Sequence, residues 1–436
     1  MRKNLMAGAT VALAALLLSA CAADDGAGDA SGGSDDGGVT TLEYWAWGTA
    51  QKPLVDEWNR THPDIQVKHT DAGGGSDSSA KLVTAARADS APDVALVEYN
   101  TLPAMIVAGV ASDITEYVSD VEGDFAPGVW SQSTFDGASY GVPQDAGPQA
   151  LTYNKARFDE LGIEVPTTWA EFADAAEAVH EADPDAYITT FAPAEFGGFA
   201  AFAQQAGAEW WTVDGGDWTV GFDDPASVEV ADYWQDLIDR DLVLAEPLLT
   251  PEWNASLNDG NILSWPAGLW AAGVINGVAG DMAGDWAMAP LPQWTEGDPA
   301  VAFQGGSAMV VTSSSKNAEA AAEFAAWMGT AEESASIQIK EGQYPASLLG
   351  QELTLESDPP ALMPQQDDYW EIAAEIAGTT IPDLSWGPNV NVASSAFQDA
   401  MSAAVTDGTP LRDALTATED VVFDDMETSG FTVTRK

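Results

Sequence analysis

Basic residues are scarce in this chain of 436 residues. Lysine and arginine together number 15 against 69 aspartates and glutamates, which gives a formal net charge of −54. A nucleic-acid binder needs a basic face for the phosphate backbone, and the few cations here are scattered along the sequence. The same negative field disfavours anionic membrane surfaces and polyanionic substrates. We therefore expect no nucleic-acid partner.

Cysteine and histidine are also rare, which limits the chemistry of any site. The only cysteine is Cys21, so an internal disulfide is impossible, and the three histidines form no His-Glu-x-x-His metal motif. The glycine-serine elbow of hydrolases and the P-loop lysine motif are missing as well. With 69 carboxylates, a pair of acids suited to glycoside hydrolysis can be proposed almost anywhere in the chain, so the presence of acids alone does not predict a glycosidase. We expect no catalytic residues, no cofactor and no enzyme.

One acidic loop, Asp214-Gly215-Gly216-Asp217, has residues that suit a calcium ion. It lacks the further spaced ligands and the terminal glutamate of an EF-hand loop. We expect a solvated turn there and no metal site.

The N-terminal segment has the layout of an export signal. Residues 1–20 contain a basic start and an apolar run from Leu5 to Leu18, which is shorter than the ~20 residues that a membrane-spanning helix needs. The order Leu-Ser-Ala before Cys21 resembles the lipobox of bacterial lipoproteins and implies that Cys21 is acylated; an ordinary signal peptide with an incidental cysteine is the alternative. Residues 21–38 then form a flexible acidic tether. We expect an exported protein, anchored by lipid to the outer face of the cytoplasmic membrane.

From Val39 onward, β-type runs alternate with amphipathic helices, which predicts α/β layers. The chain is too long for one ordinary domain and fits two or three. Thr168 and Glu171 form a capping box, and Asp224 before a proline marks another helix start. A further helix is expected after Lys316, and the chain from about residue 367 is mostly helical. Strands are expected at residues 39–47, 65–69, 93–98, 187–190, 262–265, 285–289 and 307–312.

Several motifs occur in an order that resembles one family. The most specific are Tyr140-Gly141-Val142-Pro143, Leu151–Lys155 and Thr168–Phe172. Weaker matches in the same order are residues 41–67, 91–94, 258–260, 268–270, 289–292, 305–307 and 322–327. Together they are similar to the extracytoplasmic solute-binding proteins of ABC importers, in the sugar-binding branch that includes maltose-binding protein. Leu269 departs from the proline that is commoner in that branch.

This resemblance implies an α/β, two-lobed periplasmic-binding-protein (Venus-flytrap) fold. We expect an N-terminal lobe of residues 39–146 plus 295–342, and a C-terminal lobe of residues 147–294 plus 343–436. Hinge strands are expected near 146–149, 289–295 and 340–345. A mono- or oligosaccharide is expected to bind in the cleft between the lobes of a monomer, which then delivers it to the transmembrane permease subunits.

Tryptophan is abundant, with 17 residues, and an indole stacks well on the apolar face of a sugar ring. Trp58, Trp169, Trp234 and Trp327 lie on helical apolar stripes and are expected in the core. By the resemblance, Trp270 matches the position where sugar-binding relatives stack a ring. Ring-binding and structural roles stay open for Trp47 and Trp386, and loop packing is an equal alternative for Trp211.

Acids and amides are expected to bind the sugar hydroxyls in the same cleft. Asp145 matches the position where relatives place a hydroxyl-binding acid. Glu98 and Asn100 follow a strand at the cleft edge, and Glu195 with Phe196 aligns with an acid-aromatic pair of the second lobe.

Two other functions remain open from the sequence. An acidic, tryptophan-rich cleft also suits a cationic or quaternary ammonium solute. A secreted glycosidase that uses two of the acids is the second alternative.

Overall fold

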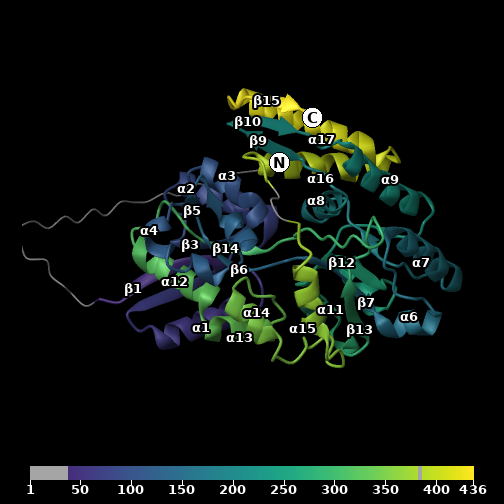
Figure 1. Ribbon diagram of the computed structural model, residues 1–436, viewed down its shortest axis with the longest axis horizontal. Coiled ribbons are helices and arrows are strands. Elements are labelled where there is room, and N and C mark those ends of the chain that lie inside the picture. The colour runs from purple at the N-terminus through teal and green to yellow at the C-terminus, as the bar shows by residue number, and fades with distance from the viewer. Residues whose placement is uncertain (1–37, 382–384) are drawn as a thin grey trace, which may run out of the picture. The chain divides into compact units, whose positions relative to one another are not determined.

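The computed structural model describes residues 38–381 and 385–436 (Figure 1). The predicted signal peptide, the acylated Cys21 and residues 22–37 of the tether lie outside these residues. Val39–Lys436 forms one compact unit. Among the described residues, no helix combines the length and the apolar character that a membrane span requires.

A five-stranded mixed sheet forms the centre of the first lobe, with strand order β2-β1-β3-β14-β6. β1 lies parallel to both β2 and β3, whereas β14 runs antiparallel between β3 and β6. The bounds are β1 (Thr40–Ala46), β2 (Ile65–Asp71), β3 (Val94–Glu98), β6 (Val142–Asp145) and β14 (Ser307–Val311). A strand from residue 307 thus completes a sheet that begins at residue 40.

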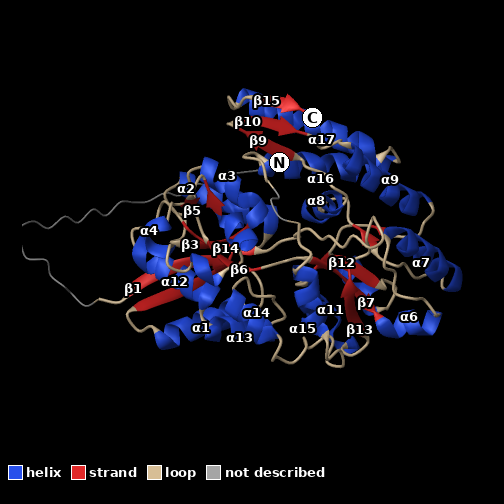
Figure 2. Cartoon of the chain, viewed as in Figure 1, coloured by secondary structure: helices blue, strands red, loops and turns tan. Residues whose placement is uncertain are grey.

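Helices cover both faces of this sheet (Figures 1 and 2). They are α1 (Gln51–Thr61), α2 (Gly75–Arg87), α3 (Leu102–Val107), α4 (Thr115–Val118), α5 (Pro127–Trp130), α12 (Ala318–Thr330), α13 (Glu332–Lys340) and α14 (Leu348–Thr354). The short 3₁₀ helix η1 (Tyr99–Thr101) follows β3 directly. A small hairpin of β4 (Thr134–Phe135) and β5 (Ala138–Ser139) lies on the same lobe.

An antiparallel sheet of order β12-β7-β13 forms the centre of the second lobe. Its strands are β7 (Gln149–Asn154), β12 (Ser264–Gly268) and β13 (Trp286–Pro290). Shorter pairs add β8 (Thr190–Phe191) with β11 (Leu244–Ala245), and β9 (Trp211–Asp214) with β10 (Asp217–Val220) and β15 (Val433–Arg435).

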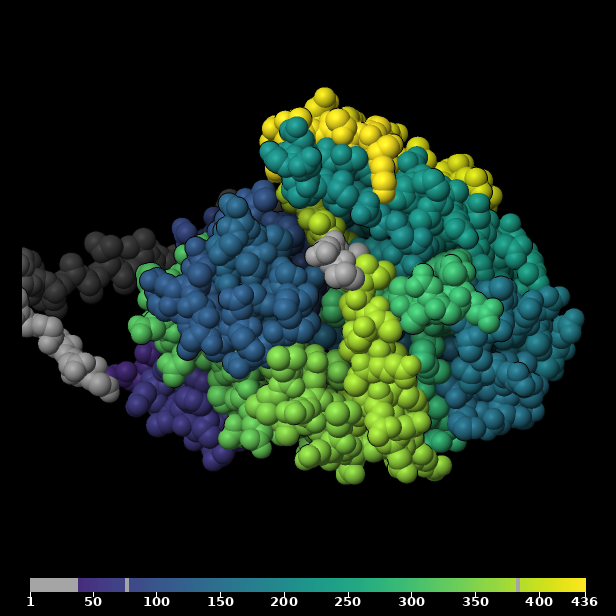
Figure 3. All heavy atoms as spheres, in the orientation of Figure 1, coloured from purple at the N-terminus to yellow at the C-terminus, as the bar shows by residue number. Residues whose placement is uncertain are grey.

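One large apolar cluster joins this sheet to its helices. They are α6 (Lys155–Leu161), α7 (Trp169–Ala182), α8 (Phe196–Gln205), α9 (Pro225–Asp239), α10 (Pro251–Asn258), α11 (Ala271–Ala279), α15 (Tyr369–Ala377), α16 (Val390–Asp407) and α17 (Leu411–Thr428). On the face shown in Figure 3, the yellow-green segment that contains α15 lies between the two lobes.

The helix signals in the sequence are confirmed. Thr168 and Glu171 make both hydrogen bonds of the capping box of α7, and Asp224 accepts from the Ser227 N–H at the start of α9. The tryptophans of α1, α7 and α9 that were expected in the core are 0–2 % exposed. Trp327 is half-buried against this core, where it packs edge-on against Trp58.

Strand bounds differ from expectation mainly in the second lobe. The expected strand at 187–190 is reduced to a single bridge at Tyr187 and to β8, which begins at Thr190. β6 and β7 are absent from the expected strands because every residue in them is buried, so they show no alternation of apolar and polar residues.

Extended segments connect the two lobes. The Gln304 N–H donates to the Gly147 carbonyl at 2.8 Å, and the Ala146 N–H donates to the Tyr344 carbonyl at 2.9 Å. Two of the three expected hinge segments, near 146–149 and 340–345, therefore lie in or beside these connections. The third expected hinge segment, 289–295, lies in the second lobe, where Gln293 pairs with Thr168. Residues 302–304, which run beside residues 147–149, take its place in the connection between the lobes.

Candidate ligand-binding site

Three acids from separate elements meet between the lobes. Glu98 ends β3, Asp145 ends β6, and Glu195 immediately precedes α8. In the first sheet, Ser307 of β14 pairs with Glu98 on one side and with Asp145 on the other. Residues in register share a face of the sheet, so this pairing brings the two acids together.

The environment of these acids disfavours their charged forms. Surrounding protein atoms, then the negative charges of Glu195 and Asp145, raise the pKa of Glu98 to about 7. Burial also raises the pKa of Asp145 to about 7, although hydrogen bonds from Ser307 to its carboxylate oppose the shift. Burial raises the pKa of Glu195, against the opposing effect of the Gly198 and Gly197 N–H groups.

A cavity lies beside the acids and takes its walls from both lobes. We call it the interlobe cavity; it is lined by Tyr99, Asn100, Gln132, Gly197, Phe303, Gly305 and Trp386. The sequence predicted Asn100 and Trp386 as ligand-binding residues, and the structure brings them together here. The Asn100 Oδ1 is buried and has no hydrogen-bond partner, so it is free to accept from a ligand.

Aromatic rings from the second lobe pack behind Trp386. The Phe196 ring centroid lies 6.2 Å from that of Trp386, and the Trp211 centroid lies 6.3 Å from it. Trp211 is only 1 % exposed, and its indole fits against Gly387, where an added Cβ would meet the Trp211 Nε1 at 2.2 Å. Phe196 and Trp211 therefore support Trp386 from behind and do not line the cavity.

Trp270 contacts the segment that connects the lobes. Its Nε1 donates to the Gln304 carbonyl at 2.7 Å, and its ring packs edge-on against Trp265. Gly305 has a φ of +80°, and a Cβ there would lie 3.1 Å from the Trp270 Nε1. Trp270 is half-buried, so one part of its ring fixes the connecting segment and another part remains accessible.

Trp47 follows β1 at the edge where β3 ends, since the two strands are parallel. Its ring packs against Gly74, where an added Cβ would meet the indole at 3.1 Å. Trp47 thus shares an edge of the sheet with Glu98, but its described contacts are with this glycine and the first-lobe core.

Comparison with known proteins decides the family. Residues 19–335 match the family of bacterial extracellular solute-binding proteins. The chain belongs to this family. An arabinooligosaccharide-binding protein of Halalkalibacterium halodurans is 27 % identical over 307 residues, which cover 66 % of this chain and 67 % of the relative.

Solved structures share the two-lobed fold of this solute-binding protein. The ABC-transporter-associated binding protein of B. animalis subsp. lactis Bl-04, in complex with β-1,6-galactobiose, has a TM-score of 0.84 and 27 % identity; the match covers 91 % of this chain and 99 % of that one. The galacto-N-biose/lacto-N-biose I-binding protein of Bifidobacterium longum, in complex with lacto-N-biose, has a TM-score of 0.81 and 29 % identity, with 92 % and 100 % covered. These relatives are binding proteins of ABC transporters.

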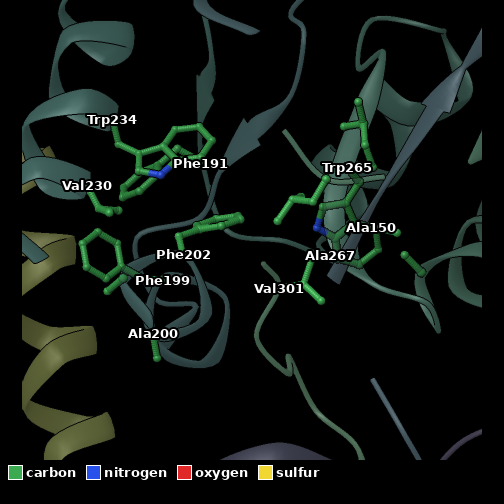
Figure 4. Close-up of a cluster of buried hydrophobic side chains, with 14 of the residues drawn as sticks. Ala150, Phe191, Phe199, Ala200, Phe202, Val230, Trp234, Trp265, Ala267 and Val301 are labelled. Atoms are coloured by element: carbon green, nitrogen blue, oxygen red, sulfur yellow. The ribbon is translucent and has the colours of Figure 1, made fainter. Parts of the chain in front are cut away.

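A second pocket of the solute-binding protein lies within the second lobe. We call it the aromatic pocket; Figure 4 shows Phe191, Phe202 and Trp234 on one side of it and Trp265 on the other. Glu195 and Gln304 line the same pocket. Gln304 and the neighbouring Phe303 and Gly305 thus line different cavities, as expected when successive side chains of an extended segment point in opposite directions.

Contributors to the site that the sequence predictions did not name include Tyr99, Gln132, Phe303, Gln304 and Ser307. The paired glycines Gly305-Gly306 could have indicated this part of the site, because glycine is favoured where the backbone passes close to other groups. A Cβ on Gly306, which has a φ of +81°, would lie 2.7 Å from the Tyr99 ring. The Tyr99 hydroxyl in turn donates to the Asp145 carbonyl at 2.9 Å.

The acidic loop expected to be a solvated turn is the turn of the β9–β10 hairpin. Asp214 pairs with Asp217, and Gly215 and Gly216 have φ angles of +59° and +97°. Within the described part of the chain, no group of three or more histidine, cysteine, aspartate or glutamate side chains is arranged to hold a metal ion.

Proposed function

We propose that this solute-binding protein is the receptor of an ABC importer and binds a mono- or oligosaccharide between its lobes. The interlobe cavity carries the proposal: one wall holds the Trp386 indole, and the opposite lobe contributes Asn100 and Tyr99. An aromatic face with convergent polar groups suits a sugar, which has both apolar C–H faces and hydroxyls. The relatives named above bind arabinooligosaccharides, β-1,6-galactobiose and lacto-N-biose.

The proposed ligand contacts come from both lobes. Glu98, Asn100 and Asp145 bind hydroxyls from the first lobe, Glu195 does so from the second, and Trp386 stacks on a ring. Trp270 and Trp47 lie at the border of the site, whereas Phe196 and Trp211 hold the Trp386 ring in place. A ligand that contacts groups of both lobes at once favours the closed arrangement over an open one.

Isothermal titration calorimetry tests the proposal on residues 39–436, which form one compact unit. The panel contains β-1,6-galactobiose, lacto-N-biose, arabinooligosaccharides, lactose and maltose. We expect micromolar or tighter binding to at least one sugar and no turnover of it. A folded protein that binds none of a broad sugar panel contradicts the proposal.

A cationic solute is the second candidate, favoured by the three acids between the lobes. The side chains that perturb Glu98 include no lysine, arginine or histidine among the described residues. Choline and glycine betaine therefore belong in the same titrations. Binding of these solutes in preference to sugars reverses the order of the two candidates.

We also propose that Cys21 is acylated and holds the receptor at the outer face of the membrane, where permease subunits accept the ligand. The lipobox-like sequence before Cys21 supports this anchor. Two acyl chains give the stable attachment that a single chain does not. Catalysis has no part in the proposal, since the family acts by binding.

A further inference from the structure

The aromatic pocket lies at the carboxyl ends of parallel strands in the second lobe. β8 runs parallel to β11, and a parallel bridge joins the residues just before β8 to those just before β12. Phe191 ends β8, Leu248 follows β11 and Trp265 belongs to β12, and all three line the pocket. Ligands of open α/β sheets bind outside these strand ends. The pocket therefore has the position of a binding site.

Hydrogen-bond donors in this pocket lack acceptors. Gln304 is 4 % exposed; its Oε1 accepts a 3.4 Å hydrogen bond from Gln149, whereas its Nε2 donates to no described residue. The Trp265 indole is also 4 % exposed and donates to none of the described residues. The Thr190 hydroxyl accepts from the Trp253 Nε1 at 3.1 Å and keeps its own hydrogen for a further acceptor. A ligand of this pocket must therefore supply acceptor oxygens.

The rest of the pocket consists of aromatic rings and one acid. The rings of Phe191, Phe202 and Trp234 lie opposite Trp265 (Figure 4), and Glu195 contributes a carboxylate that accepts hydrogen bonds. A sugar ring has hydroxyls that both donate and accept, and apolar C–H faces that pack on aromatic rings. A quaternary ammonium group also packs on such rings, but it accepts no hydrogen bond and leaves the three donors unpaired. The pocket therefore suits a sugar ring better than a cation.

The aromatic pocket and the interlobe cavity share two walls. At the start of α8, Gly197 lines the interlobe cavity and Gly198 lines the aromatic pocket, so this wall carries no side chain. In the connecting segment, Gln304 lines the aromatic pocket between Phe303 and Gly305 of the interlobe cavity. Consecutive Cα atoms are ~3.8 Å apart, so the cavities are direct neighbours. They are also similar in size, with about 380 Å³ and 320 Å³ of empty space up to their mouths.

We propose that the aromatic pocket is a second sugar subsite, so that the receptor selects a disaccharide or a longer oligosaccharide. One ring lies against Trp386 in the interlobe cavity. The next ring lies in the aromatic pocket, where the three unpaired donors bind its oxygens and Glu195 accepts from a hydroxyl. The glycosidic bond crosses the wall at Gly197 and Gly198. This inference rests on the proposed sugar-binding function and adds a minimum length of the ligand.

Calorimetry of disaccharides beside their component monosaccharides tests the subsite. The pairs are β-1,6-galactobiose with galactose, maltose with glucose, lactose with both monosaccharides, and arabinobiose with arabinose. We expect the disaccharide that binds best to bind roughly 100-fold more tightly than its monosaccharides, because the second ring adds several hydrogen bonds and a stacking face. This comparison uses wild type alone, so it is decisive even where a variant fails to fold.

Two variants locate the second ring. Trp265→Phe keeps a ring but removes its N–H, and Gln304→Leu removes the amide while the backbone hydrogen bond to Trp270 stays. Each should weaken disaccharide binding about tenfold and bring it closer to monosaccharide binding. Trp286→Phe is the matched control: Trp286 is 3 % exposed on β13, across β7 from β12, and its Nε1 has no partner, but it lines neither cavity. This variant should keep the wild-type affinities.

The outcomes separate the second subsite from the proposed function. A monosaccharide that binds as tightly as its disaccharide overturns the subsite and leaves sugar binding established. Unchanged disaccharide affinity in both pocket variants, once circular dichroism shows them folded, overturns it as well, and so does an equal loss in Trp286→Phe. Failure of wild type to bind any sugar of the panel overturns the proposed function and the second subsite together.

Discussion

The indole Nε1 of Trp270 donates a 2.7 Å hydrogen bond to the backbone carbonyl of Gln304. Gln304 belongs to a segment that connects the lobes, and its own N–H donates to the Gly147 carbonyl. A residue expected only to stack on a ligand is thereby tied to the connection between the lobes.

Substitution of Trp270 is therefore expected to lower stability as well as affinity. Trp270→Phe keeps a ring but leaves the Gln304 carbonyl unpaired, at a cost of about 1–3 kcal/mol in the free energy of unfolding. Trp270→Ala removes the ring as well and should cost more. Both variants should weaken sugar binding, Trp270→Ala by at least tenfold. Urea denaturation and calorimetry measure the two effects, and an Ala variant as stable as wild type contradicts the structural role.

Trp386 separates the binding role from the structural one. Its ring lines the interlobe cavity, so Trp386→Ala should weaken sugar binding tenfold or more with little change in the denaturation midpoint. Trp218→Ala is the matched control: Trp218 is also half-buried, but it belongs to β10 of the small β15-β10-β9 sheet, where it packs on Phe431. Equal losses of affinity in both variants contradict the proposed site.

Glu98 should make the unliganded protein less stable as pH rises. Its folded pKa of about 7 lies above the ordinary glutamate range, so the folded state holds the proton more tightly than the unfolded state. The free energy of unfolding is then greatest below the ordinary pKa and falls, by about 1–3 kcal/mol, as pH rises to about 7. Glu98→Gln should reduce the slope of this part of the profile in urea titrations from pH 4.5 to 8, and the remaining slope comes from Asp145, whose pKa is also raised to about 7. The exposed-acid variant Glu181→Gln should retain it; an unchanged profile in Glu98→Gln contradicts the assignment.

Gly306 should tolerate no side chain. Its φ is +81°, and a Cβ would meet the Tyr99 ring at 2.7 Å, so Gly306→Ala combines backbone strain with overpacking. Gly109 has a similar φ of +69° with open space around it. We expect Gly109→Ala to cost about 1 kcal/mol and Gly306→Ala about 1–3 kcal/mol more. Thermal and urea denaturation compare them, and equal costs exclude the contact with Tyr99 as the cause.

Cys21→Ser should release the protein from the membrane. Acylation of the cysteine is the proposed anchor, and a serine forms no thioether with lipid. We expect wild type in the membrane fraction with a lipid mass on its N-terminal peptide, and the variant in the soluble or secreted fraction. A wild-type N-terminus without lipid contradicts the anchor.

Local signals in the sequence predicted much of the fold. Capping at Thr168 and Asp224 depends on residues within one helical turn, so it can be recognised without knowledge of the tertiary structure. The family motifs added the two-lobed architecture. β6 and β7 were not predicted because strands buried on both faces lack the alternation of apolar and polar residues by which strands are recognised.

The sequence predicted individual residues of the site, but it did not predict which of them lie close together in the folded protein. Glu98, Asp145 and Glu195 are far apart in the sequence, and their approach depends on a strand from residue 307 that inserts between β3 and β6. Gln304 carries no motif of its own. Its position follows from pairing with Gly147 across the fold, a long-range contact that local patterns do not contain.

The alternation of residues 303–305 between two cavities offers a route to redesign. Phe303 and Gly305 line the interlobe cavity, whereas Gln304 lines the aromatic pocket. A library at position 303 can therefore alter solute preference for a biosensor while the aromatic pocket keeps its wall. A library at position 304 changes that pocket and leaves the Trp270 hydrogen bond in place, because the bond is accepted by the backbone carbonyl and not by the side chain.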